Sequence, residues 1–203
     1  MTKQERTKKI EAAAYKVLEA KGFKGASMLA IAREAKASNE TLYAWYGDKI
    51  GLFSAMIKSN AQRVESDLLK AKGNGKAGLA ALLHVGGSLL AMVTSEHAIA
   101  LNRAAAGDVT GELGRALGQE GRNKVLPILV DLLKEAYGEE QDVTEHLECF
   151  LSLLLGDLQI RRAIGTVEIL SSAEIKLRSE RAIERLQLIF APPNGPILNL
   201  QTP

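Results

Sequence analysis

The stretch SMLAIAREAKASNETLYAWYGDK, residues 27–49, predicts two short helices joined by a tight turn. Ser27 and Ser38 stand where the helices would begin, and serine is a favoured N-cap because its hydroxyl accepts a hydrogen bond from a free backbone N–H. Ile31 on the first helix and Leu42 on the second would pack against each other across a three-residue turn that ends at Ser38. This spacing predicts a helix-turn-helix motif.

Helical periodicity continues on both sides of this motif. Towards the N-terminus, apolar residues recur every three to four positions from Ile10 to Leu18, and Gly22 is expected to end that helix in a left-handed conformation. Towards the C-terminus, Asp48 is expected to cap a longer linking helix. No segment shows the alternation of a β-strand, so the sequence predicts an all-α fold. Later helices are expected over residues 79–93, 96–106, 110–137, 142–164 and 171–190, the third bent or interrupted at Pro127.

The composition excludes several classes of protein. The 203 residues are 46% hydrophobic and 25% charged, which is ordinary for a folded protein and excludes wholesale disorder. No run approaches the roughly 20 uncharged apolar residues of a membrane-spanning helix, and the polar N-terminus has no secretory signal. The single cysteine, Cys149, is consistent with a reducing compartment. We therefore expect a cytoplasmic protein without a membrane partner.

Basic charge is concentrated at the N-terminal end. Residues 1–60 hold 11 Lys/Arg and 6 Asp/Glu, whereas residues 61–203 hold 15 and 18, so the net charge of +2 divides into +5 and −3. A basic lobe on a near-neutral body favours contact with a polyanion at that end. The helix that opens at Ser38 would present its first turn outward, where it can enter a DNA major groove. From helix lengths alone, a small bundle with packed Tyr and Trp side chains remains an alternative.

The stretch from Arg6 to Met56, about a quarter of the chain, resembles the DNA-binding domain of the TetR family, in particular its AcrR-like branch. The run Thr41-Leu42-Tyr43, followed by an aromatic residue and a lysine, is the most specific part of this resemblance. The matching positions, in order and at the spacing of the family, are Arg6, Ile10, Ala13, Ala14, Lys21, Gly22, Phe23, Ala26, Ser27, Ile31, Ala32, Ala35, Ser38, Thr41, Leu42, Tyr43, Tyr46, Lys49, Leu52 and Phe53.

The resemblance implies contacts to phosphates and to base edges of double-stranded DNA with a palindromic operator. Lys36 stands where the family usually has glycine, and a non-glycine residue held at positive φ costs on the order of 1 kcal/mol. Glu40 stands where a small residue is common, and it would repel phosphate although it could accept a hydrogen bond from cytosine. The phosphate candidates are Ser27, Tyr43 and Lys49, the base-edge candidates are Asn39, Glu40, Thr41 and Trp45, and Lys36, Ser38 and Tyr46 complete the DNA-binding set.

The glycine-rich segment Gly73–Lys76 is the clearest break in the pattern. With the resemblance, it predicts a helix-turn-helix DNA-binding domain before the break and a larger helical domain, binding a small molecule and forming a homodimer, after it. The expected limits are 1–50 for the DNA-binding domain, 48–72 for the linking helix, 73–191 for the ligand-binding and dimerisation domain, and 192–203 for an irregular tail.

Two apolar helices near the C-terminus are the candidates for a four-helix dimer interface. The same pattern would also suit a core within one chain, and that alternative stays open. The predicted interface residues are Leu151, Leu154, Leu158, Ile175, Ala182, Ile183 and Leu186.

Glycines recur at spacings of 4, 3, 4 and 3 from Gly107 to Gly121, which would place them on one helical stripe. Tight helix packing and a segment that moves on ligand binding both explain such a stripe, and the pair Gly86–Gly87 allows packing or close ligand approach. The effector pocket is expected to be mainly apolar. Its candidate residues are His84, Met92, His97, Asn102, Arg103 and Arg161.

The sequence favours no catalytic chemistry. It contains no phosphate-binding loop and no arrangement for nucleophilic catalysis, and an isolated pair such as His146 and Cys149 is usually structural. We therefore expect no metal, no cofactor and no enzymatic activity. The leading interpretation is a ligand-responsive transcriptional regulator, a repressor released by a small, mainly apolar effector. The alternative, kept open by Glu40 and Lys36, is a helical small-molecule-binding or scaffold protein that no longer reads DNA.

Overall fold

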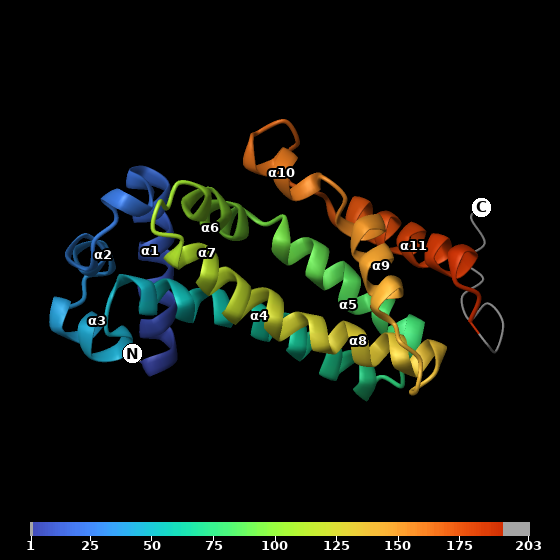
Figure 1. The fold of residues 1–203 in the computed structure, drawn as a ribbon. Coiled ribbons are helices and arrows are strands. Elements are labelled where there is room, and N and C mark those ends of the chain that lie inside the picture. Colours follow the sequence, from blue (N-terminus) through green and yellow to red (C-terminus); the bar gives the residue numbers. More distant parts are fainter. Residues whose placement is uncertain (1, 193–203) are drawn as a thin grey trace. The chain divides into compact units, whose positions relative to one another are not determined.

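The computed structural model describes residues 2–192, which form helices and contain no strand (Figure 1). The predicted all-α fold is therefore confirmed. The elements are α1 (Lys3–Gly25), α2 (Met28–Ala35), α3 (Asn39–Tyr46), α4 (Lys49–Gly73), α5 (Gly78–Val93), α6 (Glu96–Ala106), α7 (Glu112–Ala116), a π-helix η1 (Leu117–Arg122), α8 (Asn123–Tyr137), α9 (Thr144–Leu155), α10 (Leu158–Ala163) and α11 (Ser172–Ile189).

The chain divides into two compact units, each of which is made of two separate segments of the sequence. Unit 1 consists of residues 1–60 and 96–122, and unit 2 of residues 61–95 and those from 123 onward. The division falls within α4, rather than at the glycine-rich segment, because the two ends of this helix enter different hydrophobic cores. The functional limits expected from the sequence, 1–50 and 73–191, remain a prediction.

Unit 1 is built on α1, which contacts both α2 and α6. Ile10, Ile31, Leu42 and Phe53 are fully buried in its core, and Leu101 of α6 joins them. Burial of side chains of this size stabilises a fold by about 1.5–3 kcal/mol each. The helix-turn-helix is thus held from behind by apolar groups of α1, α4 and α6.

Unit 2 is a bundle in which α5 packs on α8, and α11 packs on both α5 and α9. Phe150, Leu82, Leu90 and Leu129 lie in its core without solvent exposure. The nearly all-apolar pattern of α9 reflects this position, because such a helix must be covered on several sides.

The expected single glycine stripe is wrong. The chain turns between α6 and α7, where the carboxylate of Asp108 accepts hydrogen bonds from the backbone of Thr110 (3.1 Å) and Leu113 (3.0 Å). Gly111 adopts a φ of 68° in this turn, a conformation that favours glycine. Gly107 and Gly111 therefore belong to a turn, and only the later glycines of the series lie in helical backbone.

Two other predicted helices are interrupted. The segment 110–137 contains the π-helix η1, and Pro127 lies inside α8 without breaking it, so the irregularity lies before the proline. The segment 142–164 breaks at Gly156, which has a φ of 50°. The predicted irregular tail, 192–203, lies outside the described residues apart from Pro192.

Among the described residues, no single helix is long and apolar enough to cross a membrane, although the consecutive helices α5 and α6 pass that test of length and composition when taken together.

Candidate nucleic-acid interface

Two serine caps and one left-handed residue shape the helix-turn-helix. Ser27 Oγ accepts a hydrogen bond from the Ala30 amide (3.2 Å) at the start of α2, and Ser38 Oγ accepts one from the Thr41 amide (3.1 Å) at the start of α3. Lys36 ends α2 with φ 52° and ψ 42°. The predicted positive φ at Lys36 is therefore confirmed, and its ammonium side chain is exposed beside the turn.

The first turn of α3 has one buried and one exposed side. Leu42 is fully buried, whereas Glu40 is exposed and Tyr43 retains 49% of its surface. Asn39 and Thr41 are half-buried, and the Asn39 Oδ1 atom has no hydrogen-bond partner within the described residues. Glu40 and Tyr43 are thus the side chains of α3 best placed to meet a macromolecule.

The C-terminal end of α3 packs against α1. The Tyr46 hydroxyl is buried, and this burial, together with the nearby Glu11 carboxylate, raises the pKa of Tyr46. Trp45 is half-buried, contacts the Tyr46 ring edge-on (centroids 6.3 Å apart), and lies 5.7 Å from both Lys3 Nζ and Arg6 Cζ. The structure therefore uses Tyr46 inside the domain, although the sequence placed it in the DNA-binding set.

Lys49 begins α4 and is engaged within unit 1. Its Nζ donates a hydrogen bond to the Phe23 carbonyl oxygen (2.8 Å) and lies 4.0 Å from the centroid of the Phe23 ring. The same helix start is capped by Asp48, whose Oδ1 accepts from the Gly51 amide (2.7 Å). The predicted phosphate contact of Lys49 would require its amine to leave this carbonyl.

The effector candidates fall in both units and have varied surroundings. In unit 1, the His97 ring stacks on Tyr15 with centroids 3.8 Å apart, and Asn102 donates to the Ala98 carbonyl (2.8 Å). In unit 2, His84 and Arg161 are exposed and Met92 is half-buried. Arg103 is the remaining candidate, and it lines a cavity of unit 1.

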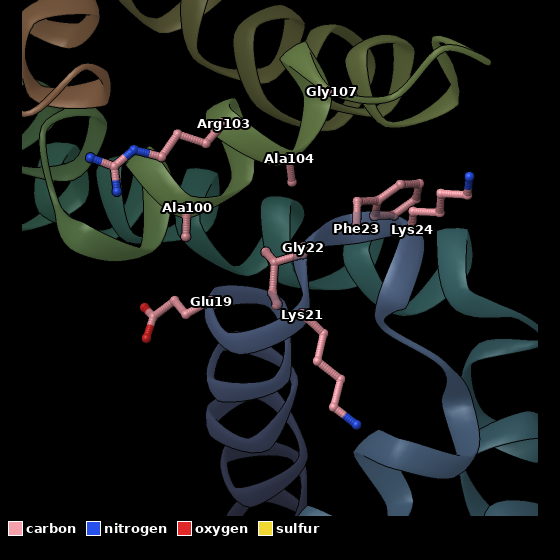
Figure 2. A pocket seen from close by; sticks show the side chains of 10 residues that line it. Glu19, Lys21, Gly22, Phe23, Lys24, Ala100, Arg103, Ala104 and Gly107 are labelled. Carbon is pink, nitrogen blue, oxygen red and sulfur yellow. The ribbon is translucent and has the colours of Figure 1, made fainter.

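That cavity has a volume of about 410 Å³ and lies beside the last turns of α1 and along α6 (Figure 2). Leu18, Phe23, Ala100 and Ala104 supply apolar lining, next to a change of backbone direction at Gly22, where φ is 65° and ψ is 175°. Gly22 therefore has the positive φ of the predicted left-handed cap, but its ψ of 175° lies outside the left-handed helical region. Figure 2 shows the charged ends of Glu19, Lys21, Lys24 and Arg103 pointing apart, so they do not converge on one ligand group.

Five of the seven predicted dimer residues are buried within unit 2 itself. Such side chains contact their own chain and have almost no surface left for a second copy. Their role in a dimer stays a prediction, because heptad-like spacing identifies a covered face without showing what covers it. Leu151 and Ile175 are half-buried. The five buried residues are Leu154, Leu158, Ala182, Ile183 and Leu186.

Arg162 is a structural residue that the sequence did not single out. It is 5% exposed, and it donates hydrogen bonds from Nε to the Thr94 carbonyl (3.1 Å) and from Nη1 to the Val167 carbonyl (3.1 Å). A cation at the C-terminal end of α5 is favoured by the helix dipole. Its neighbour Arg161, a predicted effector contact, lies on the exposed side of α10.

His146 lies between two aromatic rings of unit 2, with centroids 4.4 Å from Tyr137 and 4.0 Å from Phe190. Burial lowers its pKa below the ordinary value, although the carboxylates of Glu145 and Asp142 act in the opposite sense. No group of three or more His, Cys, Asp or Glu side chains within residues 2–192 could hold a metal ion.

A capped pair of short helices, with the second exposed along one side and supported by α1, defines the class of helix-turn-helix DNA-binding domains. Residues 10–56 match the family model of bacterial regulatory proteins, tetR family. The N-terminal part of the chain is thus similar to the helix-turn-helix domain of the tetR family, in agreement with the resemblance found in the sequence.

Solved structures share the fold along almost the entire chain. They include a TetR transcriptional regulator from Agrobacterium tumefaciens (23% identity, TM-score 0.68, covering 93% of this chain and 95% of that one). The flavonoid-responsive regulator FrrA is similar (24%, 0.63, 92% and 97%), as is the transcriptional regulator FadR from Bacillus subtilis in complex with stearoyl-CoA (18%, 0.62, 88% and 96%). A comparison with curated protein sequences finds no match.

Proposed function

We propose that this protein is a ligand-responsive transcriptional repressor that binds a palindromic operator as a homodimer. The observation that carries the proposal is the exposed side of α3, with Glu40 and Tyr43 outward, in a domain that matches the tetR family. An exposed helix of this kind can enter a major groove, and a two-fold protein matches the two half-sites of a palindrome.

We propose a dimer surface formed by apolar side chains of α9 and α11 that are not buried within unit 2. The outer side of α11 carries Leu177 and Leu188, which are 42% and 84% exposed, and α9 carries the half-buried Leu151 and Leu155. Monomeric proteins rarely leave many large apolar side chains exposed in one region. We propose that a second copy covers these positions, in place of the five core residues predicted from the sequence.

We propose a small, mainly apolar effector, and two similar structures support an apolar ligand part. FrrA is flavonoid-responsive, and the Bacillus subtilis FadR was solved with stearoyl-CoA, whose acyl chain is apolar. Release from DNA requires that the effector bind one conformation of the dimer more tightly than the other. The six effector candidates from the sequence remain part of this proposal.

DNA binding is tested by fluorescence anisotropy with the duplex upstream of the protein's own gene, over a range of salt concentrations. We expect affinity for a defined palindrome that falls as salt rises, because phosphate contacts release counterions. Tyr43→Ala should weaken binding by about tenfold through loss of a phosphate hydrogen bond, while sedimentation shows an unchanged dimer. Ile160→Ala, which alters a 67% exposed residue of α10 in unit 2 outside the proposed dimer surface, serves as the control and should leave DNA affinity unchanged.

The second candidate function is a helical small-molecule-binding or scaffold protein that no longer reads DNA. The internal bond of Lys49 and the buried hydroxyl of Tyr46 favour it, because both side chains are engaged within the domain. Absence of salt-dependent binding to any tested duplex, with the wild-type protein folded and dimeric, would favour this candidate over a repressor.

A further inference from the structure

The first two turns of α1 bring two cations to the end of α3. Lys3 Nζ and Arg6 Cζ each lie 5.7 Å from the centroid of the Trp45 ring. Cations at this distance are attracted to the electron-rich face of an indole. The contact therefore positions both side chains near the helix that is proposed to enter the groove.

The helix start that carries these cations is capped by its own side chains. Thr2 Oγ1 accepts a hydrogen bond from the Glu5 amide (3.2 Å), and the Glu5 carboxylate accepts one from the Thr2 amide (2.7 Å), which together form a capping box. Glu5 is the only acidic residue in this first turn, and its carboxylate is directed to the backbone. The backbone that carries Lys3 and Arg6 thus belongs to a capped helical turn.

The charge of the pair is not neutralised inside the domain. Neither Lys3 nor Arg6 takes part in an ion pair within residues 2–192. Two positive charges held beside one ring repel each other, so a nearby anion would stabilise the arrangement. By contrast, Lys16, which is also on α1, is paired with Glu34 of α2.

We propose that Lys3 and Arg6 form a phosphate-binding site that extends the DNA interface from α3 onto the start of α1, with Trp45 holding both cations in place. This inference rests on the proposed DNA binding and adds residues that neither the sequence nor the resemblance assigned to it. The partner is the backbone of duplex DNA beside the groove that α3 enters. Because phosphates carry no sequence information, these contacts strengthen binding to any duplex equally.

The test compares two double variants that remove the same charge. Lys3→Ala/Arg6→Ala removes the pair, and Lys8→Ala/Lys58→Ala removes two exposed cations of unit 1 that have no such ring contact among residues 2–192. Anisotropy is measured with a short non-palindromic duplex and with the upstream duplex at several salt concentrations. We expect the first variant to lower the slope of log affinity against log salt by about 2, which is about 0.9 for each lost phosphate contact, on both duplexes.

Trp45 provides an independent readout because it is the only tryptophan of the chain. Its emission should change on DNA addition in the wild-type protein and change less in Lys3→Ala/Arg6→Ala, while Lys3→Arg/Arg6→Lys should keep the wild-type slope. Lys3→Gln/Arg6→Gln repeats the test with longer polar side chains, and circular dichroism verifies that each variant is folded.

The possible outcomes distinguish failure of the phosphate site from failure of the proposed DNA-binding function. Wild-type binding to DNA with an unchanged salt slope in Lys3→Ala/Arg6→Ala overturns the phosphate site and leaves the proposed regulator standing. An equal loss of slope in both double variants also overturns it, since the effect would then come from net charge alone. No binding of any duplex by the wild-type protein refutes both.

Discussion

Two adjacent glycines in the middle of α5 allow a direct test of how unit 2 is packed. A Cβ atom added at Gly86 would lie 2.8 Å from Cζ of Phe150, whose ring is fully buried. At Gly87 it would lie 3.5 Å from Ser179 Oγ and 3.8 Å from Ile175 Cγ2, which are ordinary contact distances. The same substitution at neighbouring positions should therefore have opposite effects on stability.

The magnitudes follow from helix propensity and packing. Alanine is more favourable than glycine inside a helix by about 1 kcal/mol, so Gly87→Ala should raise the free energy of unfolding by that amount. At Gly86 the same gain is offset by overpacking of a filled core, which costs typically about 1–3 kcal/mol. We expect Gly86→Ala to lower the free energy of unfolding by about 1 kcal/mol, a difference of about 2 kcal/mol between the variants.

Urea denaturation followed by far-ultraviolet circular dichroism measures this difference. One protein concentration is used throughout, because the proposed dimerisation would make stability concentration-dependent. Phe150→Leu should be less damaging in the Gly86→Ala background than alone, since the shorter side chain frees the space that the new methyl group needs. Equal stabilisation by alanine at both positions would refute the reasoning. It would also favour the alternative in which the space at Gly86 serves a ligand.

Two further predictions concern the turn of the helix-turn-helix and the aromatic cluster of unit 2. Lys36→Gly should change the free energy of unfolding by less than about 1 kcal/mol, because relief of the left-handed strain is offset by greater freedom of the unfolded chain. If Lys36 contacts phosphate, anisotropy titrations of this variant will show a slope of log affinity against log salt that is lower by about 0.9. Burial lowers the pKa of His146, so the unfolded chain binds the proton more readily than the folded one. The free energy of unfolding should therefore be highest above a pH of about 6.5 and decline as the pH falls towards the folded-state pKa. His146→Phe should flatten that decline in urea titrations at several pH values, and an identical pH profile in both proteins would contradict it.

Local rules made the helix-turn-helix predictable from the sequence. Ser27 and Ser38 cap their helices as expected, and each cap depends on a few neighbouring residues. Their physical cause, an unsatisfied backbone amide, is therefore visible in the sequence itself. The left-handed conformation of Lys36 was instead implied by the resemblance, because the TetR family usually has glycine at this position.

Features that depend on which helix covers which were not predictable in this way. Lys49 was expected to face DNA, but its amine reaches the Phe23 carbonyl, a contact between residues 26 positions apart. The spacing from Gly107 to Gly121 fitted one helical stripe, yet the Asp108 carboxylate draws the backbone amide of Leu113 into a turn. Periodicity gives the apolar face of a helix, whereas tertiary contacts decide its partner.

Because Lys49 and Tyr46 make contacts within unit 1, other residues have to provide the electrostatic attraction to DNA. The first turn of α3 exposes Glu40, a negative charge that opposes approach to phosphate. Salt-dependent affinity therefore has to come from cations outside α3 that have no internal acidic partner, and the start of α1 supplies two of them next to Trp45. If those cations carry the phosphate contacts, Glu40→Ala should raise the affinity for every duplex. The slope of log affinity against log salt, which reports the number of counterions released on binding, should stay unchanged.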